Sequence, residues 1–253
     1  MKQAPRAGFP ARVAGLGERL QPRVLASANV VSGLGLDSAA VRARMVQRLR
    51  DAGLGCEPVW QAMALVERHR FVDSALAAQA YEDTSLPIGN GQTISKPSVV
   101  ARMLALLFDG PAARLSGRLG RVLEIGTGCG YQAAVLAQLS HDVVSIERLR
   151  PLHERAAEQL APWRGDRVRL VHGDGRLGHG PRAPYDAIIA AAGGEDLPPA
   201  WLAQLAPGGR LVAPSAARAG GGQCLVVVDN DASGLHRHTL EAVQFVPLES
   251  GAL

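Results

Sequence analysis

From residue 121 onward, short apolar segments alternate with stretches of helical spacing, and this alternation limits the possible folds more than any other feature of the chain. Short apolar strands separated by helices of roughly ten residues are typical of βαβ units around a buried, largely parallel sheet. The pattern therefore predicts a doubly wound α/β domain. Its expected strands are 122–125, 142–146, 167–171, 185–190, 209–212, 224–229 and 236–246, and its expected helices are 130–139, 149–160 and 198–205.

The part of the chain before this alternation has mainly helical signals. Asp37 or Ser38 can cap a helix over 39–50, and Pro58 stands in the first turn of a second helix. A glycine-rich irregular stretch at 86–97 leads into an apolar helix at 99–108. We therefore expect a flexible leader at 1–36 and a single domain at 37–253, which consists of an N-terminal helical section at 37–110 and an α/β core at 120–253.

The charge distribution argues against a nucleic-acid partner. Five basic residues and two acidic ones (Glu18 and Asp37) give residues 1–40 a charge of +3, so only +1 of the total of +4 is left for the other 213 residues. A nucleic-acid binder usually concentrates basic residues on a folded face. An acid-poor leader with several arginines is also compatible with an organelle transit peptide, but its low serine content favours a solvated tail.

The composition argues against a membrane protein, a secreted protein and a metal-binding protein. No segment approaches the roughly 18 apolar residues that a membrane span requires, and no apolar stretch typical of a secretory signal follows the first basic residues. Three scattered cysteines are too few for a disulfide framework or a zinc cluster. His236 and His238 lack a carboxylate or thiol at ligand spacing, so we expect no metal site. We expect a cytoplasmic monomer without a membrane partner.

The first core strand runs into a glycine-rich turn, Glu124-Ile-Gly-Thr-Gly-Cys-Gly130. Glycines allow the backbone to lie against a ligand and to direct N–H groups at it. In the dinucleotide pattern G-x-G-x-x-G the third glycine comes one residue later, where this chain has Tyr131. The spacing instead resembles the nucleoside-binding loop of S-adenosylmethionine-dependent methyltransferases, whose cofactor carries no phosphate.

Two acidic residues follow the next two strands. Glu147 comes 21 residues after Gly126 and can accept hydrogen bonds from the hydroxyls of a ribose. Asp174 stands between two glycines and could accept a hydrogen bond from an adenine amino group. Alone, Glu147 would be interpreted as a surface acid and Asp174 as an Asp-Gly turn residue. Because the carboxyl ends of successive parallel strands meet at one edge of the sheet, the combination favours a nucleoside-type cofactor site.

Between about Met45 and Leu248 the chain resembles the protein-L-isoaspartate(D-aspartate) O-methyltransferase family. The motifs that carry the resemblance are Ala80-Tyr-Glu-Asp83, Leu86-Pro-Ile-Gly89, Gly91-Gln-Thr-Ile-Ser95, Val122-Leu-Glu-Ile-Gly-Thr-Gly-Cys-Gly-Tyr-Gln-Ala-Ala134, Gly173-Asp-Gly175, Tyr185-Asp-Ala-Ile-Ile189 and Phe245-Val-Pro-Leu248. Many methyltransferases share the glycine-rich loop, whereas Gly-Gln-Thr-Ile-Ser and Phe-Val-Pro-Leu are much narrower signals.

The resemblance implies a Rossmann-like methyltransferase fold in which 37–110 caps the substrate and 120–253 binds S-adenosyl-L-methionine. It implies methyl transfer to the free carboxylate of L-isoaspartyl and D-aspartyl residues in damaged proteins and peptides, which initiates their repair. The implied catalytic residue is Ser95. The implied substrate-binding residues are Thr93, Ile94, Ser95 and Val246, and the implied cofactor-binding residues are Glu124, Gly126, Thr127, Gly128, Gly130, Glu147, Asp174 and Gly175.

The chain departs from the family pattern at several positions. Lys96-Pro97-Ser98 replaces a frequent Gln-Pro-Tyr, and Lys96 could alter which peptide flanks are accepted. Glu67-Arg68-His69-Arg70 stands where a Pro-Arg pair often precedes Phe-Val. Cys129 replaces a serine and is interpreted as a small loop residue, and Gln244 replaces a basic residue. None of these changes removes a group that the expected chemistry requires.

The implied reaction needs no general base, because a carboxylate with a pKa near about 4 is already ionised at pH 7. Catalysis then rests on in-line positioning and exclusion of water. Ser95 is expected to hydrogen-bond one carboxylate oxygen, although it could also merely cap the helix that follows. Three other functions stay open at this point: a methyltransferase for a small molecule or nucleic acid, a dinucleotide-binding module, and an inactive methyltransferase-like interaction protein.

Overall fold

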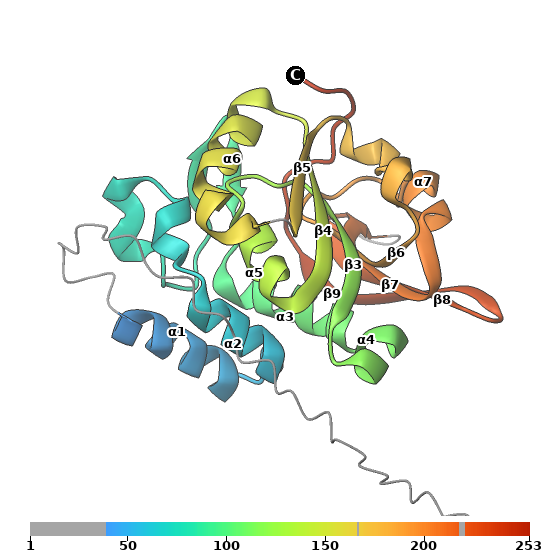
Figure 1. Cartoon of the computed structure of the whole chain (residues 1–253), viewed down its shortest axis with the longest axis horizontal. Helices are drawn as coiled ribbons and strands as arrows, with labels where there is room; N and C mark the ends of the chain where they lie inside the picture. The colour runs from blue at the N-terminus through green and yellow to red at the C-terminus, as the bar shows by residue number, and fades with distance from the viewer. Residues whose placement is uncertain (1–38, 166, 218–220) are drawn as a thin grey trace, which may run out of the picture. The chain divides into compact units, whose positions relative to one another are not determined.

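The structure is a computed structural model that describes residues 39–165, 167–217 and 221–253, so the prediction of a leader at 1–36 lies outside the described residues. Its centre is a seven-stranded sheet (Figure 1). The strands are β3 (Leu119–Ile125), β4 (Ser140–Glu147), β5 (Val168–His172), β6 (Tyr185–Ala190), β7 (Leu205–Ala216), β8 (Gln223–Asp231) and β9 (Gly234–Val243). Their order is β5-β4-β3-β6-β7-β8-β9; β3 to β7 run parallel, whereas β8 and β9 join antiparallel.

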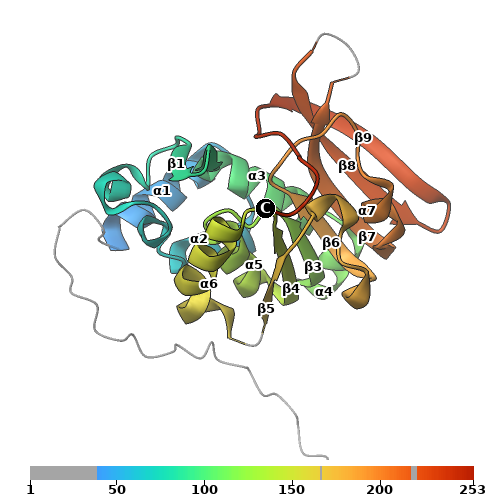
Figure 2. The same ribbon diagram turned by 90° about the horizontal axis from the view of Figure 1, so that it is seen from above.

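The connections place helices on both faces of this sheet, as the predicted doubly wound fold requires (Figure 2). Successive strand residues point to opposite faces. Val122 and Val143 therefore belong to one apolar cluster, whereas their neighbours Leu123 and Val144 pack with Trp201 in a second one. The first cluster includes α1 (Ala39–Asp51), α2 (Glu57–Leu65), α3 (Pro97–Phe108), α4 (Pro111–Ser116), α5 (Tyr131–Leu139) and α6 (Arg150–Arg164), and the second includes α7 (Pro199–Ala203).

The order of the strands reverses between β3 and β6. From β3 the chain moves outward through α5, β4 and α6 to β5, and it then starts again on the other side of β3 with β6. In open α/β sheets, ligands bind at such a switch point, outside the carboxyl ends of the strands. None of the described helices is long and apolar enough to span a bilayer.

The stretch 86–97, expected to be irregular, contains a small hairpin. Strands β1 (Leu86–Gly89) and β2 (Gln92–Ile94) pair antiparallel across Asn90 and Gly91. Both turn residues have positive φ, 54° and 69°, and an Asn-Gly dipeptide favours this type I′ turn. The prediction missed the hairpin because each strand is too short to show a clear alternation of apolar and polar residues.

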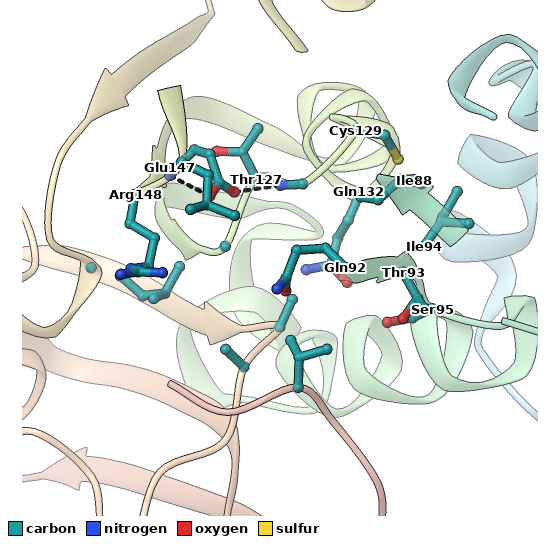
Figure 3. Close-up of a pocket in the computed structure, with 18 of the residues that line it drawn as sticks. Ile88, Gln92, Thr93, Ile94, Ser95, Thr127, Cys129, Gln132, Glu147 and Arg148 are labelled. Carbon is teal, nitrogen blue, oxygen red and sulfur yellow. Dashed lines mark hydrogen bonds between the residues drawn. The ribbon is translucent and has the colours of Figure 1, made fainter. Parts of the chain in front are cut away.

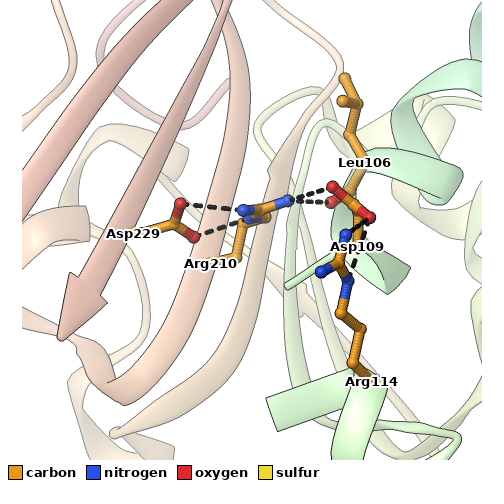
Figure 4. Close-up of polar contacts among 5 residues, drawn as sticks. All are labelled: Leu106, Asp109, Arg114, Arg210 and Asp229. Atoms are coloured by element: carbon orange, nitrogen blue, oxygen red, sulfur yellow. Dashed lines mark hydrogen bonds and ion pairs between the residues drawn. The ribbon is translucent and has the colours of Figure 1, made fainter. Parts of the chain in front are cut away.

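Other connections are short 3-10 helices: η1 (Arg68–Phe71), η2 (Ser74–Gln79), η3 (Gly175–Leu177) and η4 (Gly180–Arg182). A charged network secures the end of α3 to the sheet (Figure 4). Arg210 on β7 binds both carboxylate oxygens of Asp229 on β8, at 2.6 and 2.8 Å, and donates to the Leu106 carbonyl at 2.9 Å. It also lies 3.5 Å from Asp109, which forms an ion pair with Arg114. The helical section and the core are therefore joined by polar contacts as well as by apolar packing.

Candidate functional site

An open cavity lies at the carboxyl ends of β3 and β4, beside the switch point of the sheet (Figure 3). It is open to solvent and encloses about 870 Å³ when the space at its mouth is included. Most of its walls come from four stretches of chain, 88–95, 125–132, 146–149 and 246–249, and four further residues complete them: Val100, Gly175, Ala191 and Ala192. The hairpin and the last part of the chain thus face the loops of the α/β core across one space.

The glycine-rich loop adopts a conformation that favours glycine. Gly126, Gly128 and Gly130 have φ values of +88°, +53° and +91°, which L-residues rarely adopt. A Cβ at Gly130 would lie 2.8 Å from Cγ of Leu160, so α6 packs directly against this backbone. Gly130 does not line the cavity, whereas Gly126 and Gly128 do.

The first three amide groups of this loop are hydrogen-bonded to other groups of the protein. The N–H groups of Gly126 and Thr127 both donate to the Ile146 carbonyl, at 2.9 and 3.1 Å, and the N–H of Gly128 donates to Glu147 at 2.9 Å. Since these amides already have partners in the protein, the loop presents carbon surface to the cavity at this point. This arrangement suits a ligand without a phosphate at the loop.

Glu147 lies at the end of β4 with its carboxylate fixed in the cavity wall. One oxygen accepts a hydrogen bond from Gly128 N and the other from Leu149 N, each at 2.9 Å. The residue is only 4% exposed. Each carboxylate oxygen can accept a second hydrogen bond, so the group can bind two ligand hydroxyls without losing its backbone contacts.

Glu124 lies beneath the loop, fully buried, and does not line the cavity. It is adjacent to Ser145 on β4, whose hydroxyl donates to Oε2 of Glu124 at 2.5 Å. The Thr127 hydroxyl, 2.6 Å from Ser145 Oγ, completes the chain of hydrogen bonds up to the cavity wall. Burial raises the pKa of Glu124 to about 8, against the opposing effect of the Ser145 hydrogen bond. The carboxyl group is therefore mainly protonated at pH 7 and supports the loop from below.

Asp174 is also withdrawn from the cavity. Its Oδ1 accepts from Arg176 N at 2.8 Å and caps η3, and its Oδ2 accepts from Gly251 N at 2.7 Å. The adjacent Gly175 does line the cavity, and a Cβ there would lie 2.6 Å from Cγ2 of Ile125. Asp174 thus holds the loop after β5 and the last residues of the chain in place.

Arg148 fixes the same last residues, which we call the C-terminal segment (249–253). Its guanidinium forms an ion pair with Glu249 at 2.5 Å and donates to the Gly251 carbonyl at 3.1 Å. Backbone hydrogen bonds join Leu253 to Arg148 and Arg150. Arg148 and Glu249 both line the cavity, so this segment closes the end of the cavity that lies beside Glu147.

The opposite end of the cavity is formed by the hairpin and by Val246. Thr93, Ile94 and Ser95 all line it (Figure 3). Ser95 is half-buried, and its hydroxyl has no hydrogen-bond partner among the residues that the structure describes. Val246 is held opposite by Gly193, whose N–H donates to the Val246 carbonyl at 2.9 Å. A free hydroxyl between apolar walls can bind one oxygen of a carboxylate.

The cavity thus brings together most of the residues predicted from the sequence. Glu124, Gly130 and Asp174 lie behind its walls, and the others line it: Thr93, Ile94, Ser95, Gly126, Thr127, Gly128, Glu147, Gly175 and Val246. No group of three or more potential metal ligands occurs in the described part of the chain. Burial raises the pKa of the Cys129 thiol, which opposes a role as a nucleophile.

Sequence reasoning missed several residues of the cavity wall, and four of them supply a polar group or apolar surface beside predicted residues: Gln132, Arg148, Leu149 and Leu248. Gln132 lies one residue beyond Tyr131 in the loop motif, and Arg148 and Leu149 directly follow Glu147. Adjacency to a predicted ligand residue was therefore an available signal for three of them.

Comparisons with known proteins agree with this geometry. Residues 40–253 match the family model described as protein-L-isoaspartate(D-aspartate) O-methyltransferase (PCMT). A protein-L-isoaspartate O-methyltransferase of Leptothrix cholodnii is 64% identical over 223 residues, which cover 88% of this chain and 78% of the relative. One of Methylibium petroleiphilum is 63% identical over 221 residues, covering 87% and 81%.

Two solved structures have the same fold. A protein-L-isoaspartate O-methyltransferase superimposes with a TM-score of 0.73 at 26% identity, over 83% of this chain and 66% of that one. A putative protein-L-isoaspartate O-methyltransferase of Plasmodium falciparum, in complex with S-adenosyl-L-homocysteine, gives 0.68 at 23% identity, over 82% and 98%. On the extent of the family match and the identity to these relatives, the chain belongs to the protein-L-isoaspartate(D-aspartate) O-methyltransferase family.

Proposed function

We propose that this chain transfers the methyl group of S-adenosyl-L-methionine to the free carboxylate of L-isoaspartyl and D-aspartyl residues in damaged proteins, the first step of their repair. The observation that carries the proposal is one cavity with two different ends. A fixed carboxylate and a glycine loop form one end, and a free serine hydroxyl with apolar neighbours forms the other. Membership of the family adds the substrate class.

The residues at the first end fit this cofactor. The carboxylate of Glu147 keeps acceptor capacity for the two ribose hydroxyls, and Ile146, Leu149 and Leu248 supply apolar surface for the base. Three N–H groups of the loop are already hydrogen-bonded within the protein, which fits a ligand that has no phosphate to bind there. We assign cofactor contact to Gly126, Thr127, Gly128, Glu147 and Gly175. Glu124 and Gly130 support the loop, and a contact from Asp174 would require its Oδ2 to be shared with Gly251.

When bound, S-adenosyl-L-methionine supplies an electrophilic methyl group on a sulfonium. The chain itself has to bind the acceptor carboxylate, orient it and exclude water. Ser95 donates its hydroxyl to one carboxylate oxygen and leaves the other free to react, while Thr93, Ile94 and Val246 enclose the side chain. No proton has to be removed, because the acceptor is already ionised at pH 7. Holding two reactants in the right orientation can lower the activation free energy by roughly 7–11 kcal/mol in favourable cases.

Methyl transfer to a matched pair of peptides tests the function. Labelled S-adenosyl-L-methionine is incubated with a peptide that contains isoaspartate and with the same peptide containing normal aspartate. We expect base-labile label in the isoaspartyl peptide alone. Cofactor binding without transfer to either peptide would contradict the proposed substrate and leave the methyltransferase fold in place.

A Ser95→Ala variant is expected to lower kcat/KM for the isoaspartyl peptide by about 10- to 100-fold, the usual value of a hydrogen bond to a charged group. Binding of S-adenosyl-L-homocysteine, measured by calorimetry, is expected to stay unchanged. Ser85→Ala is the matched control, since Ser85 is exposed in the same section of the chain and does not line the cavity. Full activity of Ser95→Ala would remove Ser95 from the acceptor site; its hydroxyl does not cap α3, whose N-cap is Lys96 without a side-chain cap.

We further propose that the enzyme works as a monomer in the cytoplasm, without nucleic-acid or membrane partners. The near-neutral balance of charge beyond residue 40 supports this proposal.

A further inference from the structure

Arg68 is a fully buried cation at the start of η1. Its Nε donates to the Ala80 carbonyl and its Nη2 to the Ser95 carbonyl, both at 2.7 Å. The guanidinium carbon lies 4.8 Å from the centre of the Tyr131 ring. Four segments that are distant in the sequence therefore meet at this one side chain.

The charge of Arg68 is not paired directly with a carboxylate in the described part of the chain, although Asp83 lies near enough to act on it electrostatically. No carboxylate among the described residues forms an ion pair with it, and Nη1 lacks any hydrogen-bond partner. Burial of an unpaired charge is strongly unfavourable, and two carbonyls with an aromatic ring compensate only part of it. A neutral donor could hold the same two carbonyls, so their contacts do not explain why the group is charged.

The surroundings of Arg68 point to an anionic ligand. Ser95 offers its carbonyl to Arg68 and its unpaired hydroxyl to the cavity. Tyr131, which packs against the guanidinium, also lines the cavity, and Arg68 is the cation that acts on its buried hydroxyl. The positive charge thus lies directly behind the wall at which the acceptor carboxylate is proposed to bind.

We infer that Arg68 is a positioning residue for the methyl acceptor: it fixes Ser95 through its carbonyl and provides the positive charge that favours an ionised carboxylate at the Ser95 hydroxyl. This inference rests on the proposed function. It predicts different effects of Arg68 on binding of the acceptor and on the rate of methyl transfer. The carboxylate loses its charge as the methyl group is transferred, so a nearby cation stabilises the bound acceptor more than the transition state. Arg68 therefore acts on KM for the acceptor more than on kcat.

Arg68→Lys and Arg68→Met form a matched pair. Both variants lose the planar guanidinium with its several N–H donors and have side chains of similar length, but only lysine keeps the positive charge. For each variant and the unaltered chain, calorimetry with saturating S-adenosyl-L-homocysteine compares two peptides, one with isoaspartate and one with the neutral isoasparagine at the same position. We expect Arg68→Met to reduce the preference for the charged peptide about tenfold or more. Arg68→Lys is expected to keep most of that preference. In steady-state kinetics, Arg68→Met should raise KM for the isoaspartyl peptide by a similar factor, whereas kcat should change much less.

The inference would be overturned if Arg68→Lys and Arg68→Met preferred the charged peptide to the same extent. It would also be overturned if Arg68→Met lost affinity for both peptides and for S-adenosyl-L-homocysteine alike, because such a loss indicates a general loosening of the fold. If Arg68→Met does not fold by circular dichroism, Arg68→Gln takes its place as the neutral partner. Failure of the proposed function is recognised separately, because the unaltered chain would then transfer no methyl group to the isoaspartyl peptide.

Discussion

Replacement of Glu147 by glutamine is expected to weaken binding of S-adenosyl-L-homocysteine by roughly 100-fold, equivalent to about 2.7 kcal/mol. The carboxylate accepts one backbone N–H on each oxygen and keeps acceptor capacity for two ligand hydroxyls. An amide replaces one of these oxygens by a donor, which then faces either Gly128 N or Leu149 N. The variant therefore loses a hydrogen bond to the ligand, and the glycine loop also loses part of its support from the side chain at position 147. Isothermal titration calorimetry at pH 7.5 measures the change.

Glu154→Gln is the matched control for this experiment, because Glu154 is exposed on α6 and does not line the cavity. Its affinity should equal that of the unaltered chain. A loss of less than threefold in Glu147→Gln would remove Glu147 from the cofactor site.

Replacement of Glu124 by glutamine is expected to make stability less dependent on pH. The folded chain holds the pKa of Glu124 at about 8, whereas its ordinary value is 4.5. Between these two pH values the folded state binds a proton that the unfolded state has released. The contribution of Glu124 to stability is therefore complete below pH 4.5 and is lost as the pH rises through 8, by at most about 1.4 kcal/mol per pH unit. Glutamine resembles the protonated acid and cannot ionise.

Urea unfolding from pH 5 to pH 8.5 checks this expectation. The two proteins should be similarly stable near pH 5, and Glu124→Gln should become the more stable one by several kcal/mol toward pH 8.5. Glu158→Gln, an exposed change on α6, controls for net charge and should follow the unaltered chain. Parallel stability curves for the Glu124 variant and the unaltered chain would mean that Glu124 is ionised in the fold.

The strands and helices of the core were predictable because their sequence signals are local. Buried parallel strands such as β6 are continuous apolar runs, and α3 and α6 each carry a proline in the first turn. The extent of β7 was underestimated, since Pro207 and Gly208 resemble a break, although the strand continues through them from Leu205 to Ala216. The short helix α4 lacks enough residues for a periodic pattern.

The cavity was predictable only where a motif places the residue beside a strand end. Period-two alternation could have indicated that Glu124 lies on the same face as Val122, beneath α5, and therefore inside the protein. The partners of Asp174 could not be predicted, because Gly251 lies 77 residues later and reaches it only through the return of the chain after β9. Arg68 has the same difficulty: nothing local indicates that its guanidinium will reach Ser95, 27 residues away.

The antiparallel strands β8 and β9 bring residues 246–249 back to the cavity that the parallel strands begin. During translation the chain emerges from its N-terminus, and domains fold as their segments become available. The hairpin, the glycine loop and Glu147 leave the ribosome long before the wall that contains Val246. A nascent chain that ends before this wall therefore has an incomplete site, and the binding surface is complete only once residues 246–249 have been synthesised.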